Sequence, residues 1–240
     1  MDEAVRAFQR LNMRIRHAPK PVVVAPAGMT LGGGAEITMH GGRAVAAAES
    51  YIGLVEVGAG VVPAAGGCKE MLRRVVNPVM RVENGDVLPP RQKICEFVGQ
   101  GEVARSAEAA RDVGFLGAAD RVVMNRSHLM AEAKREVLHM APTYRPPEPE
   151  QIYAAGRDVN AALKLAIFSF LEAGYISEYD AHIGRKLAQV LTGGDLSQPQ
   201  WVDPWYILDL EREAFLSLAG EEKTQERMWH LLQEGRPLRN

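Results

Sequence analysis

The sequence predicts an α/β fold that ends in a mainly helical region. Two valine- and alanine-rich runs, PVVVAPAG and GGRAVAAAE, predict buried strands separated by a glycine-rich turn and a short helix. Beyond a proline-rich stretch, apolar residues recur at helical spacing with few interruptions. We therefore expect a β/α core over residues 1–141, a linker over 142–150 and a helical region over 151–240.

The chain opens with an amphipathic helix. Val5, Phe8, Leu11 and Ile15 are spaced three or four residues apart and therefore share one helical face. The run KPVVVAPAG then predicts one buried strand that ends at Ala27–Gly28, before the glycine turn.

The next segments alternate between extended and helical patterns. GGRAVAAAE predicts a second strand, and SYIGLVEVGAGVVPAAGG predicts a loop with brief extended pieces because it is rich in glycine and lacks a helical period. A helix opens near GGCKEMLRR. The turn residues of NPVMRVENGDVLPPRQ predict an excursion before the helical pattern resumes at Gln92. Further on, RSAEAARDVGFLGAADRVV predicts a helix capped by Ser106 and ended by Gly114, then a strand over 121–123.

After the linker, the pattern predicts helices. The apolar residues at helical spacings are Ile152, Tyr153, Val159, Leu163, Ile167 and Phe170. Asp203 as N-cap, Pro204 at the first helical position and Gly220 as stop predict another helix. Four tail aromatics favour packing between helices, or against a neighbouring domain or subunit, over an acyl-chain pocket: Trp201, Trp205, Phe215 and Trp229.

Composition excludes several classes of protein. The 240 residues are 47% hydrophobic, enough for a sizeable core, and the net charge of −2 is mixed along the chain, so neither nucleic acid nor a membrane surface is an expected partner. Cys68 and Cys95 form no CxxC pair and have no nearby histidine at ligand spacing, which argues against a disulfide framework and a metal site. No transmembrane or secretory segment is evident, so we expect a cytoplasmic location.

The stretch GMTLGGGAEITMHGG, residues 28–42, is the first candidate site. A strand that enters a helix through glycines directs backbone N–H groups toward one point, which favours an anion. Gly33 is the best-placed donor, and Glu36 follows in the first helical turn. The same pattern also suits a tight turn without a ligand, with Glu36 stabilising the helix through its dipole.

A second glutamate lies in a second glycine-rich loop. Glu56 follows Glu36 by twenty residues and sits among valine and leucine, where a charge needs a partner or a use. Two carboxylates in one apolar pocket can hold different protonation states and exchange protons. The alternative is an ion pair of Glu56 with Arg43, Arg73 or Arg74.

In order and spacing, KPVVVAPAGMTLGGGAEITM and AESYIGLVEVGAGVVPAAGGCKEML resemble the central motif of the crotonase (enoyl-CoA hydratase/isomerase) superfamily. The resemblance implies a β/α spiral core that lacks its first strands. It implies that Glu36 and Glu56 are the two catalytic glutamates, that Gly33 is an oxyanion-hole donor, and that Gly32 and Gly34 contact substrate. The implied reaction is syn hydration of a 2-trans-enoyl-CoA, because relatives that isomerise the double bond usually keep one acid.

The C-terminal sequence resembles the tail of bacterial fusions in which a 3-hydroxyacyl-CoA dehydrogenase precedes a hydratase-like domain. We therefore expect the chain to be the C-terminal part of a fatty acid β-oxidation enzyme, with acyl-CoA as ligand and the dehydrogenase domain as partner. The family's first oxyanion donor lies upstream of residue 1, and NAD is expected only there, since no GxGxxG fingerprint occurs in this chain. A homo-oligomer is possible for this family. The alternative is an inactive module that stabilises the dehydrogenase half.

The histidines are assigned no role from sequence. His40 replaces part of a Cys-Asp pair that is more usual in hydratases, and it is expected at the surface or packed. The remaining histidines lack spacing for a metal site or a catalytic pair and are expected at the surface: His17, His128, His139, His182 and His230.

Overall fold

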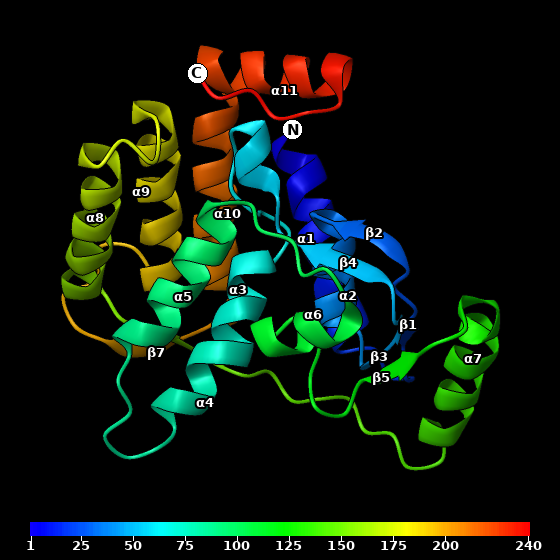
Figure 1. Cartoon of the computed structure of the whole chain (residues 1–240). Coiled ribbons are helices and arrows are strands. Elements are labelled where there is room, and N and C mark those ends of the chain that lie inside the picture. The colour runs from blue at the N-terminus through cyan, green and yellow to red at the C-terminus, as the bar shows by residue number, and fades with distance from the viewer.

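Two small parallel sheets form the first part of the molecule, as a computed structural model of residues 1–240 shows (Figure 1). The three-stranded sheet has the order β1-β3-β5, formed by Val23–Val24, Arg43–Ala47 and Arg121–Val123. The two-stranded sheet pairs β2 (Gly28–Leu31) with β4 (Ser50–Gly53). The predicted strands at 43–47 and 121–123 are therefore confirmed.

The predicted single strand before the glycine turn is wrong in its extent. β1 covers only two residues, both half-buried, and β2 begins at Gly28, where the strand was expected to end. Gly28 has a φ of +63°, in the left-handed region, and Pro21 and Pro26 have no N–H for a ladder. The chain therefore changes sheets at this point, and the glycine turn begins later, at Gly32.

The first helix, α1 (Asp2–Arg16), exists as predicted but turns a polar side to the protein. Its buried residues are Gln9, Asn12 and Met13, whereas Leu11 is 48% exposed. Gln9 donates from Nε2 to the carbonyls of Ala64 and Leu208, both at 2.7 Å, and Asn12 donates to the Ala65 carbonyl at 2.8 Å. These amides are buried because the loop after residue 63 presents carbonyls that need donors.

Several helices surround the sheets. Helices α2 (Gly33–His40) and α3 (Gly67–Met71) are the ones that carry the candidate site, and α3 continues through a π-helical turn at Leu72–Val76 into α4 (Asn77–Met80). Helix α6 (Ala107–Val113) is capped by Ser106, whose Oγ accepts from the Ala109 N–H at 3.0 Å. Gly114 ends α6 with a φ of +106°, as predicted. Helix α7 (Leu129–Met140) packs on β1 and β3.

Helix α5 (Leu88–Gly99) begins four residues earlier than the predicted start at Gln92. The proline pair at 89–90 was interpreted as part of a turn, but it occupies the first turn of the helix. Proline is tolerated there because the first N–H groups of a helix have no intrahelical acceptor. The turn itself lies at Asn84, which has a φ of +61°.

The C-terminal region contains four helices, with α8 and α9 side by side and α11 across the end of α10 (Figure 1). Their bounds are Arg157–Glu172, Glu178–Thr192, Pro204–Ala219 and Glu222–Glu234. Asp203 caps α10 through the Trp205 N–H at 2.8 Å, as predicted.

A short antiparallel ladder in this region was missed. Strand β6 (Ile152–Ala154) pairs with β7 (Gln200–Val202), so the helical interpretation of Ile152 and Tyr153 is wrong. Tyr153 lies opposite Trp201 in register, with the rings 5.2 Å apart in an edge-to-face arrangement. This cross-strand aromatic pair favours the ladder over a helix.

One hydrophobic core connects the two parts of the chain. A single cluster of 35 buried residues includes Met39 and Leu54 from the first part together with Leu191 and Ile207 from the last. No helix is long and apolar enough to cross a membrane. Stability of the first part therefore depends on helices more than a hundred residues further along the chain.

The polar side of α1 makes a testable contribution to stability. We expect Gln9→Ala to lower the free energy of unfolding by about 1–3 kcal/mol, because it removes the side-chain donor of the buried Ala64 and Leu208 carbonyls. Arg10→Ala, at the neighbouring exposed position, is the matched control and should change it by less than about 0.5 kcal/mol. Urea unfolding checks both; equal effects would contradict a specific role of Gln9.

Candidate active site

Glu36 is anchored to a loop rather than to its own helix. Gly32 precedes α2 with a φ of +54°, and Glu36 lies in the first helical turn, 3% exposed. Its Oε1 accepts from the N–H groups of Ala65, at 2.9 Å, and Gly67, at 2.8 Å. The carboxylate makes no capping bond to α2, so helix capping does not explain it.

Glu56 reaches the same place from the other glycine-rich loop. It begins a 3₁₀ turn at Glu56–Ala59, which follows β4. A Cβ placed on Gly32 would lie 3.3 Å from Glu56 Oε1, so this carboxylate lies against the residue that begins α2. Glu56 Oε2 is buried and has no hydrogen-bond partner. The residue as a whole is half-buried, but its carboxyl end is enclosed.

The predicted alternative of an ion pair for Glu56 is wrong. Arg73 and Arg74 both bind Glu70, at 2.8 and 3.3 Å, and Arg43 lies 3.6 Å from Glu136. The three arginines therefore serve other carboxylates, and Glu56 remains without a cation.

Burial gives the two glutamates unusual proton affinities. Loss of hydration raises the pKa of Glu36 to about 7, although the N–H groups of Gly67 and Ala65 act against this rise. Burial also raises the pKa of Glu56 well above its usual range, and the charge of Glu36 raises it further. Near neutral pH, one carboxyl group of such a pair can be protonated and act as a proton donor, while the other is ionised and acts as a proton acceptor.

The three glycines before Glu36 have different reasons to be glycine. Gly32 adopts a left-handed φ that other residues rarely adopt. A Cβ on Gly33 would lie 2.8 Å from the Phe8 ring of α1, whereas one on Gly34 would make an ordinary contact with Thr30. Gly33 is the first residue of α2, so its N–H is among those that a helix leaves without an intrahelical acceptor.

A further buried carboxylate, which binds the same loop as Glu36, was not found from the sequence. Glu211, on α10, is fully buried and accepts from the N–H groups of Gly66 and Lys69, each at 2.7 Å. It lies in the pattern LDLEREAF, where an acidic residue is typical of a solvated helix face. Its burial depends on contact with a loop that lies 142 residues or more earlier in the chain, so the local pattern does not indicate it.

His40 is completely buried and structural. Its Nδ1 donates to the Glu36 carbonyl at 2.6 Å, so its Nε2 accepts from Lys69 Nζ at 2.8 Å. Burial lowers the pKa of His40 to about 3, so the ring is neutral. Lys69 also binds Glu70, at 2.6 Å. No group of three or more His, Cys, Asp or Glu side chains is arranged to hold a metal ion.

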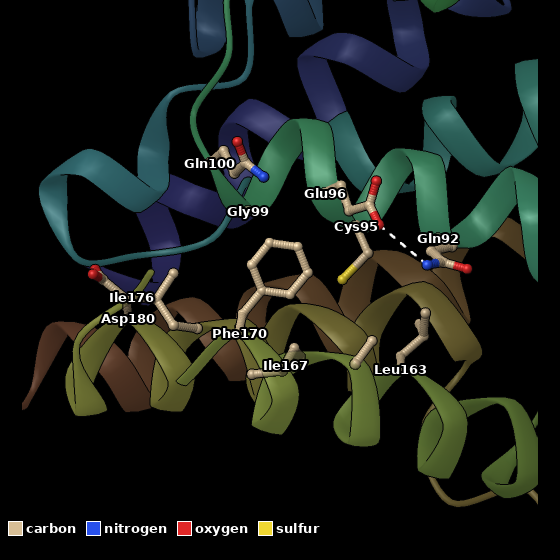
Figure 2. Close-up of a pocket in the computed structure, with 12 residues that line it drawn as sticks. Gln92, Cys95, Glu96, Gly99, Gln100, Leu163, Ile167, Phe170, Ile176 and Asp180 are labelled. Carbon is tan, nitrogen blue, oxygen red and sulfur yellow. Dashed lines mark hydrogen bonds between the residues drawn. The ribbon is translucent and has the colours of Figure 1, made fainter. Parts of the chain in front are cut away.

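Two cavities are lined in part by the C-terminal helices. A narrow pocket of about 70 Å³ lies between α5, α8 and α9. The side chains of Phe170 and Cys95 point into it (Figure 2). A larger cavity, of about 610 Å³, adjoins Leu31 and Val57, the neighbours of Gly32 and Glu56. Both cavities are lined by Phe170. Cys68 and Cys95 are free thiols, and burial raises the pKa of each.

The family model for enoyl-CoA hydratase/isomerase matches residues 2–78, which include Gly33, Glu36 and Glu56. Over these residues the chain resembles the crotonase superfamily. Its sequence is 42% identical over its whole length to a Bacillus subtilis protein described as a probable 3-hydroxyacyl-CoA dehydrogenase, and it spans 30% of that relative. It is 32% identical to a probable enoyl-CoA hydratase of the same organism, over 47% of this chain and 38% of the relative.

Solved structures share the fold. The enoyl-CoA hydratase from Bacillus halodurans superimposes with a TM-score of 0.55 at 15% identity, over 95% of this chain and 68% of the other. The carnitinyl-CoA hydratase from Mycobacterium avium gives 0.52 at 19% identity, over 93% and 64%. At these identities the likeness establishes the crotonase-like fold, as the sequence predicted.

The unpartnered Glu56 carboxyl makes a prediction about stability and pH. Its raised pKa means that the folded state holds this proton more tightly than the unfolded state, so the contribution of Glu56 to stability falls as pH rises above its usual pKa. Glu56→Gln should therefore raise the free energy of unfolding at pH 8, by about 1–3 kcal/mol, and change it less at pH 5.

Thermal unfolding at both pH values measures this difference. The matched control is Glu49→Gln at an exposed position, where no pH-dependent gain is expected. A gain for Glu56→Gln that is equal at pH 5 and pH 8 would contradict the raised pKa.

Proposed function

We propose that the chain carries the acid–base centre of an enoyl-CoA hydratase, which adds water to a 2-trans-enoyl-CoA to give a 3-hydroxyacyl-CoA. The observation that carries the proposal is the pair formed by the buried Glu36 and by Glu56, whose Oε2 is buried, at one helix N-terminus without a paired cation. The match of residues 2–78 to the enoyl-CoA hydratase/isomerase family supports this chemistry, and the two acids favour hydration over isomerisation.

The environments of the two glutamates suggest their roles. Glu36 accepts two backbone N–H groups, which favours its carboxylate form, whereas Glu56 has an oxygen without a partner and more reason to hold a proton. In this mechanism, a water between them bonds through its oxygen to C3 and gives a proton to Glu36. Glu56 gives its proton to C2, and a proton passed from Glu36 to Glu56 restores the starting state.

The negative charge that develops during attack needs a donor. As the C2–C3 π electrons move toward the carbonyl, charge builds on the thioester oxygen, and the Gly33 N–H is the group in this chain that we assign to it. An oxyanion donor of this kind contributes about 2.7–4 kcal/mol to the transition state. We propose that the second donor comes from a part of the protein outside residues 1–240.

The cavity of about 610 Å³ is the place that we propose for the acyl group. It is lined by Leu31, which precedes Gly32, and by Val57, which follows Glu56. A 3-hydroxyacyl-CoA leaving this site is the class of compound that a 3-hydroxyacyl-CoA dehydrogenase oxidises. We therefore propose that the longer protein carries out consecutive steps of fatty acid β-oxidation, with NAD bound outside this chain.

A second candidate function is that of a non-catalytic module that packs against the dehydrogenase half. Trp229 and Leu232, both on α11, are 64% and 81% exposed. Trp229 therefore does not pack between helices of this chain, and a neighbouring domain or subunit is the remaining predicted contact.

Hydration should depend on both acids. Replacing either one by glutamine, in Glu36→Gln or Glu56→Gln, should lower the turnover of crotonyl-CoA by the full-length protein by about 100-fold or more. Loss of absorbance of the conjugated thioester measures this turnover. Glu49→Gln is the matched control and should retain full activity; undiminished turnover in both site variants would refute the proposal.

Binding separates the two candidate functions. Isothermal calorimetry of this chain with a saturated acyl-CoA should give a micromolar or tighter complex if the acyl site exists. Gly58 lines the cavity, and a Cβ added at this position would lie 3.3 Å from Pro237 Cγ. Gly58→Leu should therefore fill part of the cavity and weaken the complex. An absence of binding by the full-length protein would favour the packing module instead.

A further inference from the structure

We propose that Glu211 is a positioning residue for Glu36: it binds the N–H groups of Gly66 and Lys69 and so fixes the loop whose other N–H groups bind Glu36. This inference rests on the proposed function for its catalytic meaning. Its physical content, a coupling between two buried carboxylates, can be measured without any activity.

The two carboxylates take alternate N–H groups of one loop. Glu36 binds those of Ala65 and Gly67 through Oε1, while Glu211 binds those of Gly66 through Oε2 and Lys69 through Oε1. Gly66, which lies between the two donors of Glu36 and itself donates to Glu211, has a left-handed φ of +109°. Movement of the loop away from Glu211 would therefore also displace the donors that hold Glu36.

The loop is closely fitted at Gly66. A Cβ at this position would lie 2.7 Å from His40 Cε1 and 3.4 Å from Leu208 Cδ2. His40 donates to the Glu36 carbonyl, and Leu208 lies on α10 three residues before Glu211. The helices that carry the two carboxylates thus enclose the same glycine, which leaves little freedom to change their separation.

Nearby charges do not neutralise Glu211 by direct contact. Lys69 donates to Glu211 through its backbone, but its ammonium group binds Glu70 and His40. The other ionisable groups whose charges interact in this region are Glu36, Glu56 and Cys68. Helix α1 contributes the neutral amides of Gln9 and Asn12. Lys186 of α9 binds Ser217 of α10 at the surface.

The coupling has a definite sign. Burial raises the pKa of Glu211 well above its usual range, and the charge of Glu36 raises it further. Because the charge of Glu36 is one cause of this rise, Glu36 ionises before Glu211, and Glu211 acts on Glu36 through the N–H groups of Ala65 and Gly67, which lower the pKa of Glu36. Glu211 lies outside residues 2–78, so the C-terminal helices would help to set the protonation state of a glutamate within the matched region.

The wild-type chain allows a first test by NMR. The amide signals of Ala65 and Gly67 report on Glu36, and those of Gly66 and Lys69 report on Glu211. During a pH titration, we expect each pair of signals to show both inflections, because ionisation of one carboxylate changes the other. Two independent titrations, each confined to its own pair of amides, would overturn the proposal.

A variant gives the direction. In Glu211→Gln, an amide nitrogen replaces one of the two oxygens that accept from the loop, so the N–H groups that lower the pKa of Glu36 should be displaced. The carboxyl carbon signal of Glu36, assigned by its loss in Glu36→Gln, should therefore titrate above its wild-type midpoint. Glu136→Gln removes another buried glutamate, on α7, and is the matched control that should leave the midpoint unchanged. An unchanged or lowered midpoint in Glu211→Gln would overturn the proposal.

Activity separates the inference from the function on which it rests. If the full-length protein hydrates crotonyl-CoA, the pH profile of its kcat/KM should move to higher pH in Glu211→Gln, because Glu36 loses N–H donors that lower its pKa. Simple loss of stability does not produce such a shift. If it does not hydrate crotonyl-CoA, the proposed function fails. The NMR titrations still decide whether Glu211 is coupled to Glu36.

Discussion

The backbone of residues 64–69 is the constraint on which this structure depends. Side chains from three helices satisfy this loop: Gln9 and Asn12 of α1 donate to its carbonyls, and Glu36 of α2 and Glu211 of α10 accept from its N–H groups. Buried carboxylates are costly without such donors. The loop therefore holds together helices from opposite ends of the chain and allows two negative charges to lie inside the protein.

An asymmetry between the glutamates follows from this arrangement. Glu36 receives two N–H groups from the loop, whereas Glu56 lies against Gly32 with one oxygen unpartnered. Stability alone gives no reason for an unpartnered buried carboxyl, since removing it should strengthen the fold. Costly polar groups of this kind are typical of sites where chemistry has been favoured over stability.

The sequence predicted features that depend on local chemistry. The Ser106 cap, the Gly114 stop and the Asp203 cap are set by residues within one turn, and the strands at 43–47 and 121–123 by short apolar runs. The resemblance to the crotonase motif also implied that Glu36 and Glu56 act together, and in the structure the Glu56 carboxylate lies against Gly32, which precedes α2.

Features that depend on distant partners could not be predicted in this way. The buried side of α1 is polar because of carbonyls more than fifty residues away, the β6–β7 ladder depends on the contact of Tyr153 with Trp201, and Glu211 resembles a surface residue until α10 meets the loop. In each case, tertiary contacts override a local pattern that has another reasonable interpretation.

The central claim is that the buried glutamates share protons at neutral pH, and infrared spectroscopy of the carboxyl groups tests it most directly. The account predicts a stretching band of protonated carboxyl at pH 7 that resists exchange into bulk water and is reduced in Glu56→Gln. A spectrum at pH 7 that contains only ionised carboxylates would contradict the account.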